Sequence, residues 1–171
     1  LALNRSEMRM TRLSDISLVP QAALNSLNPV IRVQRQIIDG IIDHAEGEKP
    51  TKEELNERVQ ELLRTVGLPS SVARMYPHEL SGGMKQRVAM AIATSLSPKL
   101  IIADEPTSAL DVVVQRQIME TLGQLQEGLS ASVILIGHDM GLIAQFADTI
   151  GIMYAGKLVE FGPVEAIFEN A

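Results

Sequence analysis

The 171-residue sequence contains no cysteine and no tryptophan, and aromatic residues make up only 3% of it. The absence of cysteine excludes disulfides and thiolate metal sites, and it is consistent with a reducing compartment. With so few aromatics, the core must be built mainly from Leu, Ile, Val, Ala and Met. No run approaches the roughly 18 uninterrupted apolar residues of a membrane span. The net charge of −6 argues against a broad nucleic-acid surface, so we expect no nucleic-acid partner.

What the sequence does contain is typical of a soluble globular protein, with 46% hydrophobic and 21% charged residues. The length is sufficient for one domain, or for a domain with a small subdomain. The chain begins with Leu1 rather than Met, so we expect it to be a piece of a longer polypeptide.

The segment from about residue 25 to residue 76 is expected to be helical, with no strand of its own. Apolar residues recur at helical spacing over residues 30–44, and the sequence EGEKPT then interrupts the pattern. Thr51 followed by Glu54 predicts a capping box at the start of a second helix, and Gly67 predicts its end. The apolar stripe of this second helix consists of Leu55, Val59, Leu62, Leu63 and Val66.

From residue 80 onward, expected helices alternate with short apolar strands. The elements in order are a helix opened by Ser81 and ended by Pro98, a strand over 100–103, a helix over 112–126, a strand over 133–136, a short helix over 141–146 and a hairpin over 149–162. A further strand is expected just before Pro20. This alternation predicts an α/β protein whose parallel sheet is covered on both faces.

The stretch LIIADEPTSALD places two carboxylates, Asp104 and Glu105, after an apolar run. A bare pair there would be desolvated and self-repelling, so we expect a cationic partner such as a divalent metal on a nucleotide. Activation of a water molecule is another task for such a pair. Adjacent residues on a strand point to opposite faces, which would give the two carboxylates separate roles. The alternative is a solvated turn.

A second candidate site is the stretch HELSGGMKQRVAMAIA. Ser81, Gly82 and Gly83 begin an expected helix, where unpaired N–H groups and the helix dipole favour an anion. The two glycines allow the backbone to approach a phosphate closely. The alternative is a capped helix that follows a loop.

Four motifs together resemble those of the ABC-type ATPases and occur in the order of that family. LSGGMKQR resembles the signature motif, LIIADEPTSALD resembles the Walker B strand plus D-loop, and ILIGHDM is similar to the switch-histidine motif. LVPQAALNSLNP resembles the Q-loop in the form seen in oligopeptide, dipeptide and nickel importers. YPHELSGG, DVVVQ and MYAGKLVEFGP also fit that subfamily, so the resemblance covers nearly the whole chain.

The resemblance implies a partial P-loop (RecA-like) ATPase core with a parallel sheet, plus an α-helical subdomain. Residues 1–24 would be a remnant of the core that ends in the Q-loop. Residues 25–97 would form the helical subdomain with the signature motif. Residues 98–171 would be the C-terminal half of the core.

The resemblance also implies roles for the residues around the nucleotide. Asp104 would hold Mg²⁺ through its water shell, and Glu105 would be the base that polarises the attacking water. His138 would contact the γ-phosphate and orient that water. Gln21 would bind the metal as well, sense the γ-phosphate and link to the helical region. Without the order of the motifs, His138 would be read as a surface residue and Gln21 as a turn residue.

The signature and D-loop residues are implied to act across a dimer interface. Ser81, Gly82 and Gly83 would bind the nucleotide held by a second subunit, and Asp111 would lie at the interface. Asp111 is also a plausible N-cap for the helix that follows it.

One motif of the family has no good match in the sequence. A phosphate loop of the form G-x-x-x-x-G-K-S/T holds the β- and γ-phosphates and Mg²⁺. The near match GIMYAGKL puts Leu158 at the position of the hydroxyl, and its alternation predicts a hairpin with Gly156 at the turn. In the family this loop precedes the Q-loop, so we expect the chain to begin after the primary ATP site. Exposed apolar edges would follow.

The function implied is that of an ATP-hydrolysing subunit that powers import of peptides or related small solutes, of the dipeptide, oligopeptide or nickel type. ATP and Mg²⁺ would be its cofactors. Its partners would be a second ATPase subunit, arranged head to tail, and transmembrane permease subunits. The protein itself would be cytoplasmic and peripheral on the inner face of the cell membrane. A first alternative is an incompetent fragment that only donates its signature motif or serves as an interaction module. A second is a soluble ABC ATPase of DNA repair or translation, which the acidic balance and the importer-like SLNP disfavour.

Overall fold

The computed structural model of the chain describes residues 3–21, 26–45, 47 and 49–169. It divides into two compact units, Leu1–Ile136 and Gly137–Ala171, and each is described by itself. None of the helices in the described ranges has both the length and the apolar character of a transmembrane helix.

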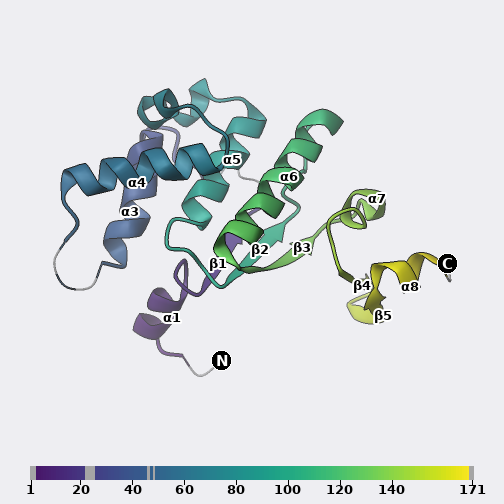
Figure 1. Cartoon of the computed structure of the whole chain (residues 1–171). Helices are drawn as coiled ribbons and strands as arrows, with labels where there is room; N and C mark the ends of the chain where they lie inside the picture. Colours follow the sequence, from purple (N-terminus) through teal and green to yellow (C-terminus); the bar gives the residue numbers. More distant parts are fainter. Residues whose placement is uncertain (1–2, 22–25, 46, 48, 170–171) are drawn as a thin grey trace. The chain divides into compact units, whose positions relative to one another are not determined.

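A three-stranded parallel sheet organises the first unit (Figure 1). Its strands are β1 (Ile16–Val19), β2 (Leu100–Asp104) and β3 (Ser132–Ile136), in the order β1-β2-β3. The register pairs Leu18 with Ile102 and Ile102 with Ile134, so the three strands end at the same edge of the sheet. The expected parallel sheet and the α/β fold class are therefore confirmed.

The helices expected within residues 25–76 are confirmed in the described part of that range. They are α3 (Val33–Asp43), α4 (Lys52–Thr65) and the 3-10 helix η1 (Ser70–Arg74), and the 3-10 helix η2 (Pro77–Glu79) and α5 (Gly82–Ala93) follow. Thr51 caps α4, since its hydroxyl accepts from the Glu54 N–H at 3.2 Å and its own N–H donates to the Glu54 carboxylate at 2.7 Å. Gly67 follows the end of α4 with φ of 69°, and the next N–H donates to the Leu63 carbonyl. The five residues of the apolar stripe of α4 are all buried.

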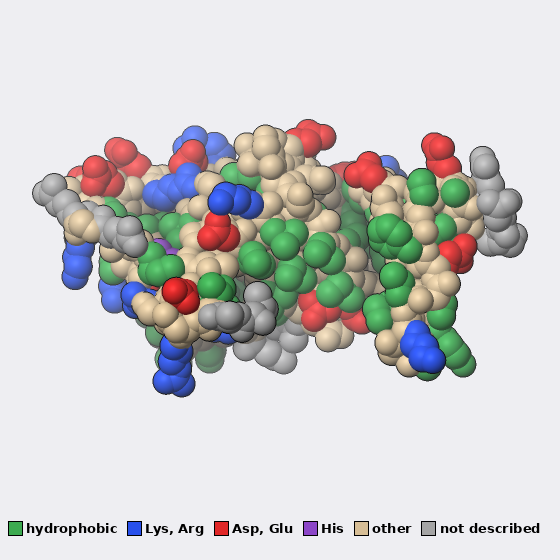
Figure 2. Space-filling model, turned by 90° about the horizontal axis from the view of Figure 1, so that it is seen from below, with side chains coloured by type: hydrophobic (Ala, Val, Ile, Leu, Met, Phe, Trp, Pro, Cys, Tyr) green, Lys and Arg blue, Asp and Glu red, His purple; other side chains and the backbone are tan. Residues whose placement is uncertain are grey.

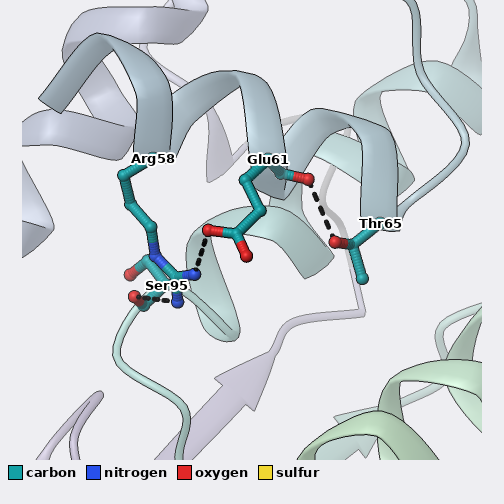
Figure 3. A network of polar contacts seen from close by, with 4 residues as sticks. All are labelled: Arg58, Glu61, Thr65 and Ser95. Atoms are coloured by element: carbon teal, nitrogen blue, oxygen red, sulfur yellow. Dashed lines mark hydrogen bonds and ion pairs between the residues drawn. The ribbon is translucent and has the colours of Figure 1, made fainter. Parts of the chain in front are cut away.

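A polar network joins α4 to the end of α5 (Figure 3). Arg58 donates from Nη2 to the Ser95 carbonyl at 3.1 Å and from Nη1 to Glu61 at 2.6 Å. One turn further along α4, the Thr65 hydroxyl donates to the Glu61 carbonyl at 3.0 Å. Because the Arg58 side chain is only one-third exposed, the bonds that it makes are partly shielded from competing water.

Within the described residues of the first unit, helices cover the sheet on one face, which differs from the expectation of two covered faces. Helices α5 and α6 (Val112–Leu129) contribute to one hydrophobic core with Val19, Ile101 and Ala103. The alternate positions point away from this core, and Leu18 and Ile134 are about half exposed. Strand alternation explains the difference, since within the described residues only one set of alternate positions meets the helices. Hydrophobic side chains thus reach the surface among charged ones (Figure 2). The exposure of apolar sheet edges stays a prediction.

The second unit contains α7 (Met140–Ile143), β4 (Thr149–Tyr154), β5 (Lys157–Pro163) and α8 (Val164–Glu169). Strands β4 and β5 pair antiparallel, and Gly156 sits at their turn with φ of 76°. The near match GIMYAGKL is therefore a β-hairpin rather than a phosphate loop that opens a helix.

Several boundaries differ from the sequence-based expectations. Helix α5 ends at Ala93 rather than reaching Pro98, α6 continues to Leu129, and α7 begins at Met140 and ends at Ile143. An additional helix, α1 (Arg5–Thr11), was not expected. The start of this helix is nevertheless marked by a local sequence pattern, because the Asn4 side chain and Glu7 form a capping box.

Candidate functional site

The carboxyl edge of the parallel sheet gathers three of the candidate residues. Gln21 follows β1, Asp104 is the last residue of β2, and Glu105 comes directly after it. The Gln21 amide donates from Nε2 to Glu105 Oε2 at 2.8 Å, although the two residues are 84 positions apart. In open α/β sheets, this edge is where ligands bind.

The backbone of Glu105 leaves the strand in an unusual conformation. Its φ is 42°, in the left-handed region, which costs a non-glycine residue roughly 1–2 kcal/mol. Its N–H donates to the Ile136 carbonyl of β3 at 2.9 Å, and its carbonyl accepts from the Ser108 N–H at 3.0 Å. Strand alternation does not set the direction of the Glu105 side chain, because β2 ends at Asp104 and Glu105 has left the extended backbone. The separate roles of the two carboxylates stay a prediction.

The loop after Glu105 leads into α6 through a capped turn. Ala109 is also left-handed, with φ of 61°. Asp111 is the N-cap of α6, and its Oδ1 accepts from the Val114 N–H at 3.0 Å. The Gln115 side chain donates to the Thr107 carbonyl at 3.3 Å. The N-cap interpretation of Asp111 is therefore confirmed, and its place at a dimer interface stays a prediction.

The residues Ser81, Gly82 and Gly83 form the start of α5, as expected. Ser81 is the exposed N-cap, and its hydroxyl accepts from the Met84 N–H at 3.3 Å. Gly83 packs closely on α6, since a Cβ built there would lie 2.6 Å from Val114 Cγ1. Sequence reasoning missed Val114. No sequence signal would have found it, because the contact joins two helices far apart along the chain.

His138 belongs to the second unit, two residues past the end of β3. Its neighbour Asp139 is the N-cap of α7 and accepts from the Leu142 N–H at 2.9 Å. The role of His138 toward residues of the first unit stays a prediction.

The donor set at the sheet edge fits Mg²⁺ bound together with a nucleotide. Asp104, Glu105 and Gln21 offer carboxylate and amide oxygens, which this hard cation prefers. Within the described part of the chain, no three or more His, Cys, Asp or Glu side chains form a group that could hold a metal ion. Mg²⁺ typically binds proteins through one or two carboxylates together with water and substrate phosphates.

Curated relatives are similar over almost the whole chain. The oligopeptide transport ATP-binding protein OppD of Bacillus subtilis is 45% identical over 168 residues, which cover 97% of this chain and 46% of that protein. The dipeptide transport ATP-binding protein DppD of Lactococcus lactis is 42% identical over 172 residues, covering 99% of this chain and 49% of that protein. The chain thus spans about half the length of these relatives.

Solved structures of ATP-binding cassettes share the fold. The cassette MJ0796, in a post-hydrolysis dimer bound to ADP and Pi, superposes with a TM-score of 0.81 at 29% identity, covering 95% of this chain and 68% of that one. The cbiO1 protein of Clostridium perfringens, part of the transporter complex cbiONQ, gives 0.83 at 28% identity, covering 97% and 63%. The profile of the ABC transporter family matches residues 2–108, more than half of the sequence. The chain therefore belongs to the ABC transporter family.

Proposed function

We propose that this chain is the part of an ATP-hydrolysing subunit that carries the Q-loop, signature, Walker B and switch motifs, and that the subunit powers import of peptides or related small solutes. The names of the similar proteins, which are peptide-transport ATP-binding proteins, support this substrate class. The observation that carries the proposal is the 2.8 Å hydrogen bond between Gln21 and Glu105. It joins the two side chains that the family pattern assigns to γ-phosphate sensing and to water activation.

Glu105 is the proposed base. Its carboxylate accepts a proton from the attacking water, and the Gln21 amide holds that carboxylate at the edge of the sheet. Asp104 lies one residue earlier and would hold Mg²⁺ through water. When bound with ATP, Mg²⁺ supplies positive charge that offsets the two carboxylates and the phosphates. His138 is proposed to orient the same water at the γ-phosphate.

The other proposed contacts lie across a head-to-tail dimer. Ser81, Gly82 and Gly83 present the start of α5 to a nucleotide held by the second ATPase subunit, and Asp111 contacts that subunit. The lysine and the hydroxyl of the phosphate loop come from a polypeptide segment outside these 171 residues. Transmembrane permease subunits are the remaining partners, and the ATPase subunit is peripheral on the inner face of the membrane. The proposal also divides the chain into three parts. Residues 1–24 are a remnant of the ATPase core, residues 25–97 are the helical subdomain, and residues 98–171 are the C-terminal half of the core.

A second candidate function is that of a signature-motif donor without turnover of its own. The observation in its favour is that the sequence has no G-x-x-x-x-G-K-S/T, and that its near match folds as the β4–β5 hairpin. Such a chain would complete the ATP site of an intact partner but would hydrolyse nothing by itself.

A chimera distinguishes the two candidates. The 168 matched residues of the Bacillus subtilis OppD protein are replaced by this chain, and Mg²⁺-dependent ATP hydrolysis and oligopeptide uptake are measured. We expect both activities to be retained. A chimera that folds and binds ATP but neither hydrolyses it nor supports uptake would contradict the first proposal and leave the second.

A further inference from the structure

The start of α5 and the first turn of α6 fit together without room for an added atom. A Cβ on Gly83 would lie 2.6 Å from Val114 Cγ1, a separation that packed carbon atoms do not adopt. The same Cβ would lie 4.0 Å from Val114 Cβ, which is an ordinary van der Waals contact. One methyl group of Val114 therefore occupies the space that a side chain at position 83 would need.

Val114 is itself held firmly in place. Its N–H donates to the Asp111 carboxylate at 3.0 Å, so its backbone is part of the N-terminal cap of α6. Its side chain is half-buried and packs on the hydrophobic core together with Met84 and Leu110. A β-branched side chain in a helix has one strongly preferred χ1 rotamer, so the methyl group cannot easily swing away. The contact with Gly83 is therefore a rigid one.

The first turn of α6 also reaches the loop that follows Glu105. Gln115, the next residue, donates from its side chain to the Thr107 carbonyl at 3.3 Å and from its backbone to the Asp111 carbonyl at 2.8 Å. One helical turn thus touches both the start of α5 and the loop after the carboxylate pair.

We infer that Val114 is a positioning residue that fixes the Ser81–Gly83 turn relative to Asp111 and to the loop after Glu105. The inference rests on the proposed function of that turn. Val114 acts through Gly83 and touches no reacting atom. A displacement of about 1 Å in a group that positions substrate can cost on the order of 10²-fold in rate, so a rigid contact beneath the turn matters for turnover.

A double-substitution cycle on the chain itself tests the contact. We expect Gly83→Ala to shift the urea unfolding equilibrium toward the unfolded state by about tenfold, within the range for overpacking a well-packed site. The packing loss of Val114→Ala alone is measured as the second single variant. Relative to that variant, the double variant should show only a small further loss from Gly83→Ala, because the nearest side-chain atom of residue 114 is then the Cβ at 4.0 Å. The matched control is Val113→Ala, on the same turn but 68% exposed, which should recover nothing. A Gly83→Ala chain as stable as the unsubstituted one would overturn the inference.

The OppD chimera provides the functional readout. Gly83→Ala should lower kcat/KM for ATP by at least about tenfold, and adding Val114→Ala should restore most of it, whereas Val113→Ala should not. If Gly83 serves only to let the backbone approach phosphate, the added methyl still blocks that approach. The double variant then stays as slow as Gly83→Ala, which overturns the positioning role. An unsubstituted chimera without ATPase activity would refute the proposed function instead, and the unfolding cycle would still decide whether the contact exists.

Discussion

Replacing Glu105 by Gln separates the chemical role of this residue from its structural one. Both side chains have the same length, and both must adopt the left-handed backbone at φ of 42°. The Gln21 amide can still donate to the oxygen of the new amide, in place of Glu105 Oε2 at 2.8 Å. The structural loss is the difference between a charge-assisted and a neutral hydrogen bond, about 1 kcal/mol before screening at this exposed position.

The expected chemical loss is much larger. Removing a general base costs on the order of 10²–10⁴ in rate, or roughly 3–5 kcal/mol in the activation barrier. In the OppD chimera we therefore expect Glu105→Gln to lower ATP turnover by this factor, to spare ATP binding and to trap an ATP-bound dimer. Urea unfolding of the chain should change little. Turnover within tenfold of the unsubstituted chimera would mean that the base lies elsewhere.

One further substitution is a matched control for this experiment, and two others test the roles of the neighbouring site residues. Glu120→Gln removes the same charge from an exposed surface pair with Arg116, and it should leave turnover unchanged. Asp104→Ala should weaken Mg²⁺-dependent binding and hydrolysis together. His138→Ala should slow hydrolysis while binding stays largely intact.

Three other outcomes can be measured on the chain without the chimera. Magnesium-dependent ATP hydrolysis should be absent or very slow, and calorimetry should find no sub-micromolar ATP affinity, because the sequence lacks the phosphate-loop motif. Gly67→Ala should destabilise the chain by about 1 kcal/mol at its φ of 69°, whereas Gly123→Ala, in open space within α6, should stabilise it by about 0.5–1 kcal/mol; effects of the same sign would refute this. Hydrogen bonds from Thr51 lower the pKa of Glu54, so the stability difference between the unsubstituted chain and Glu54→Gln should be present at pH 7 and shrink below about pH 4.5; a difference unchanged at pH 3 would contradict it.

Local signals predicted the helical region well. The capping box of Thr51 and Glu54 and the left-handed Gly67 both depend on residues within one helical turn, so their pattern is visible in the sequence. Asn4 and Glu7 form the same kind of capping box at the start of α1, a helix that was not predicted. The hairpin around Gly156 was predictable for a similar reason, since strand alternation and turn chemistry are local.

The geometry of the candidate site could not be predicted in the same way. The left-handed backbone of Glu105 depends on a hydrogen bond to Ile136, which lies on the neighbouring strand. The packing of Gly83 on Val114 depends on how two helices meet. The one-sided cover of the sheet depends on which alternate positions the helices reach. Each of these features is set by contacts between residues distant in the sequence, and apolar periodicity does not specify them.

The position of Glu105 explains how the sheet can tolerate its backbone conformation. Strand β2 lies between β1 and β3, so its last residues have a parallel neighbour on each side. The Glu105 N–H still donates to Ile136 of β3, while its side chain accepts from Gln21, which follows β1. Two hydrogen bonds, one to each flanking segment, therefore fix a residue whose left-handed backbone costs roughly 1–2 kcal/mol. Backbone outliers of this kind persist only where the surroundings over-determine them, and they cluster at functional sites. Leu13, Ser97, Ser130 and Ala155 also have a left-handed backbone outside the candidate site, so the conformation supports the proposed role of Glu105 only in combination with its hydrogen bond to Gln21.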